Sequence, residues 1–574
     1  MDSPIIQQQL AEIRDEWKQR TAQPAGAIFD CLESGDIVDA ASRVLFAAEP
    51  AERGTIVESL QRRLPEMYGS ASAEQKAQLL QFAVKLALDF GSFLPAWRSG
   101  DPSPQTAQAG ALRALAERLA AADSDAAAAV HSGLRAELLA RLGAEAVSDP
   151  AEAERTAGAA MGSDLAAHIG AMWDEYRVSN TRRAAELYLR GQCVTALGND
   201  YAAFLDHALR VGVCSQTTNP VLIKLAWDTD PPAWNQRIDR IITDTYDIET
   251  IRNTLGQGAD KQDELIRHLN TLVTTTVVER NCRMLRDIFL LTEGREGHLN
   301  LQVSPENYAD SDAMVEQAVA VYGDLRRRLG GVPNVVIKIP ATPAGREAVA
   351  ELTRRGIGVT VTLTFSMYQA GPIAEAIRDG NALAANIAVM NGRLAFPVRD
   401  ELAAAGVSGG VEAARWAGVE VARKVNSMLY GPTDRGGMGL DRNRIRLLIA
   451  SLRIYDDWLP DISELWGVPA ITIFPNVRRT FDLHPREIDP NAIAGRTPPQ
   501  AIDTMLSSEI FRQAWWTEKD GSHGKPDRPL SMSRADDDAV ANWAPVKQTL
   551  DQFIDGYRQM NGMILDRLKS IVAD

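Results

Sequence analysis

The sequence lacks several features that mark specialised classes of protein. Its four cysteines, Cys31, Cys193, Cys214 and Cys282, are far apart and show no CxxC spacing, which argues against a disulfide framework or a structural zinc site. No uninterrupted apolar stretch of about 18 residues occurs, so no membrane span is expected. The first residues lack the basic and then apolar pattern of a signal peptide. Together these absences predict a soluble, cytoplasmic protein.

Positive charge is also scarce. Of the 574 residues, 61 are Lys or Arg and 76 are Asp or Glu, which gives a net charge of −15. A surface of that sign repels nucleic acids and anionic membranes, so neither is an expected partner. An anionic small molecule would therefore need a local pocket of Arg or Lys. No His or Cys spacing indicates a metal ion or an organic cofactor.

The pattern of apolar residues changes near residue 180. Before it, segments such as EQKAQLLQFAVKLALDF and GALRALAERLAAA carry apolar residues at three- and four-residue spacings. That spacing is typical of amphipathic helices. The sequence therefore predicts an all-helical N-terminal domain over residues 1–178, in which no residue pattern indicates chemistry.

Short apolar or Thr-rich runs alternate with helical stretches between residues 179 and 481. Strand followed by helix, repeated about eight times, predicts the α/β class and a (β/α)8 TIM barrel. A doubly wound open sheet is the alternative, and the lack of a GxGxxG after the first strand disfavours it. The predicted strands lie within residues 192–200, 212–220, 298–305, 334–340, 358–366, 386–393, 444–452 and 468–475.

The remaining tail, residues 482–574, divides into two parts. Residues 482–540 carry irregular stretches such as LHPREIDPNAIAGRTPPQ, which predict a long loop or lid. Residues 541–571 have the spacing of one or two closing helices that pack on the barrel. The sequence allows a homo-oligomer but does not indicate one.

Lys338 lies in the apolar strand NVVIKIP, where a charged side chain is costly. Val336 and Ile337 precede it and Ile339 follows, so both faces of the strand are apolar and the barrel interior is its main route to water. It also lies near the strand's end, where barrel active sites collect. A desolvated lysine with a lowered pKa suits a Schiff-base nucleophile, because only the neutral amine attacks a carbonyl.

The segment TTNP, residues 217–220, ends an earlier predicted strand. Asn219 can donate and accept hydrogen bonds, which suits sugar hydroxyls. Asn-Pro is also a common turn opener. Taken alone, the segment favours a turn over a binding site.

These segments and their surroundings resemble the transaldolase family of class I Schiff-base aldolases. The similar stretches are QTTNPVLI, LQVSPENYADSDAMVEQA, VVIKIPATPAGREAVAELTRRGIGVTVTLTFSMYQA and ITIFPN. The third is the most specific, since Thr362 follows Lys338 by 24 residues, which matches the family's lysine-to-threonine spacing. The likeness covers roughly residues 190–480 and implies the barrel that the strand count predicts independently. It leaves the helical N-terminal domain unexplained.

The resemblance implies catalytic roles for four residues. Lys338 matches the Schiff-base lysine, and Thr362 matches the threonine that helps to hold the catalytic water. Asp200 is the candidate for the first-strand acid/base, with Asn199 as its competitor. Gln302 stands where most transaldolases carry a catalytic glutamate, and fructose-6-phosphate aldolases also carry glutamine there. An amide can orient a water but cannot take its proton.

The resemblance also implies a substrate pocket. Asn219, with Thr218 beside it, matches the segment that binds the donor's hydroxyls, and Arg393 matches the arginine that binds the substrate phosphate. Arg453 resembles a second arginine of that site. Ala388 and Met390 replace the family's serine and aromatic residue, which suggests a larger or altered sugar site.

The sequence thus predicts a transferase. A transaldolase of carbohydrate metabolism, such as the pentose phosphate pathway, would move a dihydroxyacetone unit between sugar phosphates without a metal or cofactor. One alternative is a divergent Schiff-base aldolase or transaldolase that acts on another sugar in a specialised pathway. A second alternative is an inactive barrel that serves as a binding or scaffolding protein.

Overall fold

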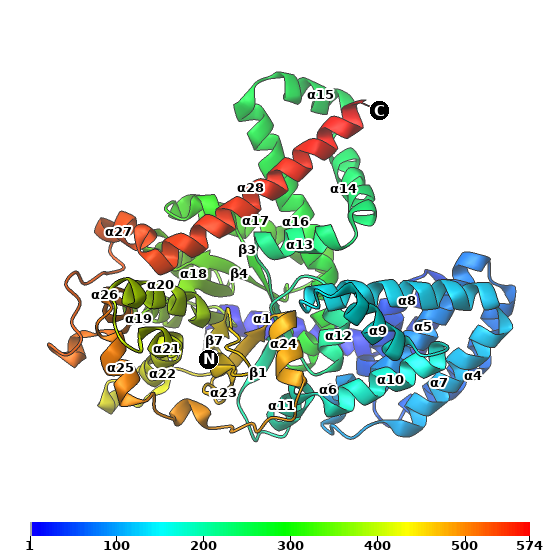
Figure 1. Ribbon diagram of the computed structural model, residues 1–574. Helices are drawn as coiled ribbons and strands as arrows, with labels where there is room; N and C mark the ends of the chain where they lie inside the picture. The colour runs from blue at the N-terminus through cyan, green and yellow to red at the C-terminus, as the bar shows by residue number, and fades with distance from the viewer. Residues whose placement is uncertain (1–2, 574) are drawn as a thin grey trace.

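Eight parallel strands form a closed barrel at the centre of the molecule (Figure 1). The computed structural model describes residues 3–573. Each strand pairs with the next along the chain, and β1 pairs with β8 to close the barrel. The strands are β1 (Ala196–Asn199), β2 (Ser215–Thr217), β3 (Leu299–Gln302), β4 (Val335–Pro340), β5 (Val359–Thr364), β6 (Ala385–Met390), β7 (Ile445–Ala450) and β8 (Ala470–Ile473). Seven of them lie within the predicted runs and β6 begins one residue before its run, so the predicted TIM barrel is confirmed.

The strands are apolar because helices cover the outside of the barrel while side chains fill its interior. All six residues of β4, β5 and β7 are buried, as expected for parallel strands enclosed on both faces. The covering helices of the barrel's second half are α17 (Ser311–Leu329), α18 (Pro343–Arg354), α19 (Met367–Arg378), α20 (Asn391–Ala404), α21 (Gly410–Ala414), α22 (Ala417–Tyr430) and α23 (Pro460–Ser463).

Helices alone make up the chain before the barrel, which confirms the prediction of a helical N-terminal region. At its centre lies α5, where ten residues are buried and Ser72 forms a capping box with Gln75. The region contains α1 (Pro4–Thr21), α2 (Pro24–Glu33), α3 (Ile37–Ser42), η1 (Arg43–Ala47), α4 (Arg53–Ser70), α5 (Ala73–Phe90), α6 (Leu94–Ser99), α7 (Thr106–Ala122), α8 (Ser124–Ala144), α9 (Pro150–Met161), α10 (Leu165–Val178) and α11 (Asn180–Leu189).

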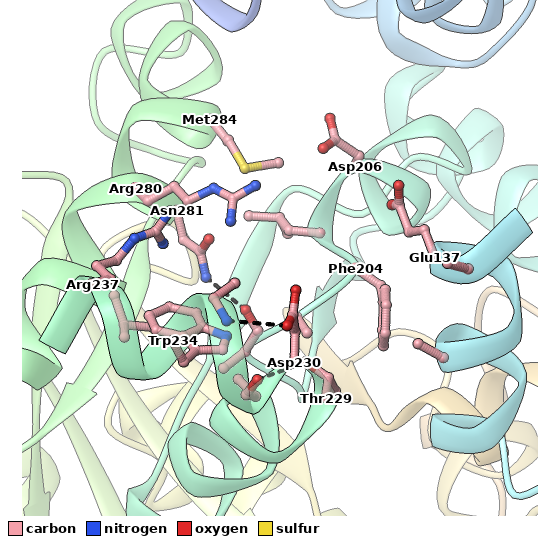
Figure 2. Close-up of a pocket in the computed structure, with 18 of the residues that line it drawn as sticks. Glu137, Phe204, Asp206, Thr229, Asp230, Trp234, Arg237, Arg280, Asn281 and Met284 are labelled. Atoms are coloured by element: carbon pink, nitrogen blue, oxygen red, sulfur yellow. Dashed lines mark hydrogen bonds between the residues drawn. The ribbon is translucent and has the colours of Figure 1, made fainter. Parts of the chain in front are cut away.

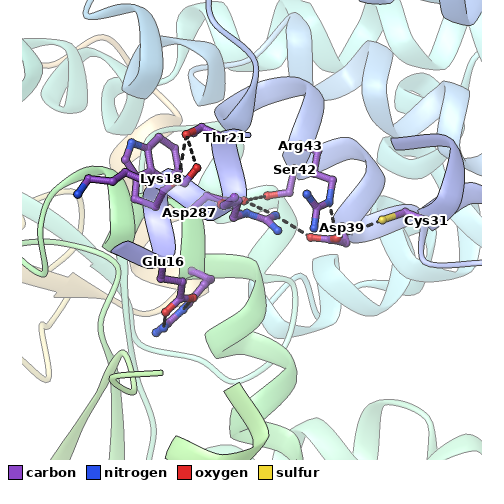
Figure 3. Close-up of polar contacts among 11 residues, drawn as sticks. Glu16, Lys18, Thr21, Cys31, Asp39, Ser42, Arg43 and Asp287 are labelled. Carbon is purple, nitrogen blue, oxygen red and sulfur yellow. Dashed lines mark hydrogen bonds and ion pairs between the residues drawn. The ribbon is translucent and has the colours of Figure 1, made fainter. Parts of the chain in front are cut away.

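The first helix, α1, lies against the barrel's outer helices. Arg20 of α1 pairs with Asp287 on the long helix before β3, and Ser42 of α3 donates to the same carboxylate (Figure 3). The side-chain amide of Gln9 donates to the carbonyl of Gly356. These contacts join α1 to the barrel across the predicted domain boundary at residue 178.

An insertion between β2 and β3 projects from the barrel together with the C-terminal helix (Figure 1). It contains α13 (Pro220–Thr229), α14 (Pro231–Thr245), α15 (Ile248–Gly256) and α16 (Ala259–Leu291); the short α12 (Leu205–Arg210) lies earlier, between β1 and β2. The 33 residues of α16 correspond to a helix roughly 50 Å long. Ile238, Ile242 and Leu269 form a small apolar core here with Leu568 of the C-terminal helix.

The tail after β8 first runs along the barrel and then crosses its mouth. It contains α24 (Pro475–Asp482), α25 (Pro499–Met505), α26 (Glu509–Trp515), α27 (Asp537–Asn542) and α28 (Ala544–Ala573). The sequence predicts one or two closing helices, and the structure has one helix of 30 residues, α28. Across residues 3–573, no helix combines the length and apolar character needed to cross a membrane.

Candidate active site

A cavity of about 480 Å³ lies at the carboxyl ends of the strands, beneath α28. Parallel barrels gather functional side chains at this end. The cavity brings together eight of the ten predicted site residues, all except Thr218 and Gln302. Its polar and charged lining residues are Asp200, Thr217, Asn219, Lys338, Thr360, Thr362, Arg393, Ser451, Arg453, Asn476 and Gln552.

Lys338 projects from β4 into this cavity and is only 5% exposed. Its Nζ donates to the backbone carbonyl of Thr218 at 3.2 Å and lies 5.7 Å from the ring centre of Phe553. Burial is the largest influence on the pKa of Lys338 and lowers it; Asp200 raises it and Arg393 lowers it, and the net pKa is about 8. Near neutral pH a minor fraction of the amine is therefore neutral and able to attack a carbonyl.

Asp200 follows β1 and lines the same cavity. Its carboxylate accepts a hydrogen bond from Thr217 Oγ1 at 2.6 Å. Burial raises the pKa of Asp200, whereas Lys338 and Thr217 act in the opposite direction. Asn199, the competing candidate, points elsewhere, because its side chain bonds the carbonyl of Tyr201 and the guanidinium of Arg478. The geometry therefore favours Asp200 over Asn199.

The turn segment after β2 contributes to the site in two ways. Asn219 caps α13, since its Oδ1 accepts from Leu222 N at 3.0 Å, and the residue also lines the cavity. The turn and the binding-site interpretations are thus compatible. Thr218 does not line the cavity with its side chain, because its hydroxyl donates to the carbonyl of Asn300. It acts on the site through the carbonyl that accepts from Lys338.

The wall formed by β5 and β6 carries Thr362, Ala388 and Met390. Thr362 Oγ1 contacts the sulfur of Met390 at 3.5 Å. Next to it, Leu363 takes a left-handed backbone conformation with φ 58°, and the register to β6 shifts there. That conformation costs a bulky residue about 1–2 kcal/mol. Strain of this kind is common beside functional side chains.

Two arginines also line the cavity. Arg393 lies in the first turn of α20 and Arg453 follows β7, and within residues 3–573 neither forms an ion pair of 4.0 Å or less. Burial and the nearby Arg453 lower the pKa of Arg393 to about 10. Its guanidinium donates to Gln552 Oε1 at 2.6 Å, while Arg453 donates to the carbonyls of Ser451 and Leu452. Two adjacent guanidinium groups without a carboxylate partner suit a phosphate.

Gln302 does not line the active-site cavity. It is the last residue of β3 and pairs in register with Lys338, and it lines a small separate cavity together with Tyr557 and Ser304. Tyr557 belongs to α28, and the sequence pattern does not predict that this helix lies next to β3. Among the described residues, Asp200 is the one carboxylate that lines the active-site cavity.

Several lining residues were not predicted. Phe553 and Gln552 come from α28 in the tail, and Phe474 and Asn476 follow β8. The ring of Phe553 lies over both Lys338 and Arg393, at 5.7 and 5.8 Å. The cavity therefore has an aromatic side chain, but Phe553 of the C-terminal helix supplies it, since Met390 stands where the family resemblance implies an aromatic residue. The only available signal was the segment ITIFPN, which contains Phe474 and Asn476.

The arrangement combines a buried amine, a carboxylate and two guanidinium groups in one cavity. The amine can form an imine, the carboxylate can move a proton, and the guanidinium groups can hold an anion. Across residues 3–573 no group of three or more His, Cys, Asp or Glu side chains is arranged to hold a metal ion.

Comparison with known proteins agrees with this geometry. A sequence model described as transaldolase/fructose-6-phosphate aldolase matches residues 202–519, more than half of the chain. The chain is 28% identical to a transaldolase of Thiobacillus denitrificans over 169 residues, which are 29% of this chain and 40% of the relative. It is 33% identical to a transaldolase of Mycolicibacterium smegmatis over 135 residues, or 24% of this chain and 33% of the relative. Each match therefore spans less than half of the relative's length.

Proposed function

Because the chain belongs to the transaldolase/fructose-6-phosphate aldolase family, we propose that it transfers a three-carbon dihydroxyacetone unit from a ketose phosphate to an aldose phosphate. The observation that carries this proposal is the buried Lys338, whose pKa of about 8 lies within reach of neutral pH. Asp200 lines the same cavity. The reaction belongs to sugar metabolism of the pentose phosphate type and needs no metal or organic cofactor.

The first half of the reaction cleaves the donor. Neutral Lys338 attacks the ketone carbon of the ketose, and loss of one water gives an iminium. Asp200 then takes the proton of the hydroxyl group two carbons away from the iminium carbon. That oxygen becomes a carbonyl as the adjacent carbon–carbon bond breaks, and the bonding electrons neutralise the iminium to give an enamine. An aldose phosphate leaves.

The second half reverses these steps with a new acceptor. The enamine carbon attacks the aldehyde carbon of a second aldose phosphate, and protonated Asp200 returns its proton to the resulting alkoxide. Water then adds to the iminium and releases the new ketose and neutral Lys338. Asn219 and Thr362 line the same cavity, and in this proposal Asn219 binds the three-carbon unit and Thr362 helps to hold this water. Arg393 and Arg453 hold the phosphate.

A related lyase activity is the second candidate. Asp200 is the one carboxylate lining the described cavity, and Gln302 lies outside it. A site with a single proton-transfer group could hydrolyse the enamine instead of passing it to an acceptor, which would release free dihydroxyacetone. Ala388 and Met390 also leave room for another sugar. The substrate and the fate of the three-carbon unit must therefore be measured separately.

Reductive trapping tests the covalent chemistry. The protein is incubated with fructose 6-phosphate and borohydride, and its peptides are analysed by mass. We expect a three-carbon adduct on Lys338, no adduct in Lys338→Ala, and an unchanged adduct in Lys224→Ala, a control lysine that pairs with Asp228 on α13. The absence of an adduct with every ketose tested would refute both the transaldolase and the aldolase. Transfer to erythrose 4-phosphate, compared with release of dihydroxyacetone, then distinguishes the two.

A further inference from the structure

A second cavity lies outside the barrel, between the N-terminal helices and the insertion after β2 (Figure 2). Its volume is about 610 Å³, larger than that of the active-site cavity and within the usual range for small-molecule sites. One wall comes from α8, and the other comes from α14 and α16. We call this cavity the interdomain cleft. Clefts between domains are common ligand sites.

One wall of the interdomain cleft carries two arginines, together with the carboxylate of Asp230, which caps α14 by accepting from Ala233 N. Arg237 of α14 and Arg280 of α16 line it, and across residues 3–573 neither has an ion pair within 4.0 Å. The guanidinium of Arg237 lies 4.9 Å from the ring centre of Trp234. Burial lowers the pKa of Arg237, and repulsion from the positive charge of Arg280 lowers it by a smaller amount. In a chain of net charge −15, two such arginines side by side are suited to one anion with two charges.

The opposite wall is acidic. Glu137 of α8 lines it and, among the described residues, has no ion pair or hydrogen-bond partner. Asp206 lies beside it and pairs with Lys85 at 2.8 Å. Figure 2 shows both carboxylates across the cleft from Arg237. Such a wall accepts hydrogen bonds from hydroxyl groups and disfavours a second anion.

The cleft is distinct from the active site. The segment from Asp200 to Asp206 runs between the two cavities, with Asp200 lining one and Phe204 lining the other. Tyr201 stacks on Phe204 and packs edge-on against Phe474, so rings fill the space between the two sites. None of the lining residues is shared.

We propose that the interdomain cleft binds a phosphorylated polyol, with its phosphate on Arg237 and Arg280 and its hydroxyl groups toward Glu137. A dianionic phosphate matches the two positive charges, and the acidic wall selects a neutral, hydrogen-bond-donating remainder. The ligand is a second bound molecule, in addition to any substrate in the barrel.

Calorimetric titration with glycerol 3-phosphate tests the proposal on the full chain. Arg393→Ala first weakens phosphate binding in the barrel, so that binding at the cleft dominates the signal. In that background we expect one bound molecule, and adding Arg237→Ala and Arg280→Ala should weaken its binding at least about tenfold. Adding Arg240→Ala and Arg267→Ala instead, which removes the same charge from α14 and α16 outside the cleft, should leave the affinity within about twofold.

Comparison with inorganic phosphate distinguishes the contributions of the two walls of the cleft to binding. Glu137→Gln should weaken binding of glycerol 3-phosphate several-fold but leave inorganic phosphate unchanged. The proposal fails if no binding remains in the Arg393→Ala background, or if the Arg237 and Arg280 substitutions have no greater effect than the control pair. It also fails if a monocarboxylate such as acetate binds as tightly as glycerol 3-phosphate.

Discussion

At the scale of single residues, Lys338 lies between two opposite electrostatic influences. Burial and Arg393 favour its neutral form, whereas Asp200 favours its charged form. The balance gives a pKa of about 8, well below the ordinary value for lysine. Burial of the Lys338 side chain in the folded protein is thus what makes the neutral amine accessible near neutral pH.

This balance predicts the pH dependence of the reaction. Neutral Lys338 and ionised Asp200 both require deprotonation, so kcat/KM should rise with pH through about 8. A pH profile of kcat/KM with a ketose phosphate checks this rise. A rate that declines between pH 7 and 8.5 would contradict the proposed role of neutral Lys338.

Removing Arg393 should shift the rising limb to higher pH. Arg393→Gln removes a positive charge that lowers the pKa of Lys338, so more alkaline conditions are needed to neutralise the amine. The pH dependence of borohydride trapping with dihydroxyacetone, which has no phosphate, measures this shift independently of phosphate binding. Arg399→Gln, an exposed arginine on the same helix that pairs with Asp400, serves as the control and should leave the profile unchanged.

The sequence located the residues that strand periodicity and family resemblance could fix, such as Lys338, Thr362 and Arg393. It could not locate Phe553 and Gln552, because no local pattern indicates that a helix more than 150 residues later covers the cavity. Gln302 pairs in register with Lys338 but lines a separate small cavity with Tyr557 of α28, and no local pattern predicts that neighbour.

At the scale of elements, α28 forms the roof of the active site. It packs against α13, α14, α16 and α20, and it carries both Phe553 over Lys338 and Leu568 in the core of the insertion. Amphipathic spacing predicted a helix in this segment, but it could not predict which elements the apolar face would cover. One helix thus joins the barrel mouth to the insertion.

At Gly556, α28 passes close to Val221 of α13. A Cβ atom there would lie 2.6 Å from Val221 Cγ2 and 3.2 Å from the backbone nitrogen of Val221. Gly556→Val should therefore push α28 away from α13, lower the free energy of unfolding by about 1–3 kcal/mol and reduce kcat/KM. Urea denaturation and steady-state kinetics measure the two effects.

Gly562 offers a matched control on the same helix, because a Cβ atom added there would meet nothing within 4 Å. Gly562→Ala should raise the free energy of unfolding by about 0.5–1 kcal/mol through helix propensity and leave kcat/KM unchanged. Equal losses of activity in the two variants would show that the spacing of α28 and α13 does not matter for the site.

At the scale of the whole molecule, α1 fastens the N-terminal helices to the barrel. Asp287 is 1% exposed and receives hydrogen bonds from Arg20 and Ser42. Arg20 also pairs with Asp39 at 2.6 Å. Burial opposes ionisation of Asp39, but Arg20 and Arg43 outweigh it and lower its pKa to about 2. This cluster joins α1, α3 and α16 (Figure 3).

Breaking the cluster should be costly. Arg20→Gln leaves the buried carboxylate of Asp287 without its cation, and removing one partner of a buried pair costs about 3–5 kcal/mol. The same side of the molecule offers Lys18→Gln as a control, because Lys18 and Asp15 are both largely exposed and such pairs contribute about 0–1 kcal/mol. Urea denaturation of both variants compares the losses, and similar midpoints would contradict the assigned role of Arg20.

The pair of Arg20 and Asp287 also has a temporal consequence, since 267 residues separate them in the chain. At synthesis rates of about 5–20 residues per second, α1 leaves the ribosome roughly 13–53 s before α16 is complete. During that interval the apolar face of α1, with Ile13 at its centre, has no barrel to cover it. Docking of α1 onto α16 therefore cannot begin until that interval has passed, and a chaperone could bind the exposed face of α1 in the meantime.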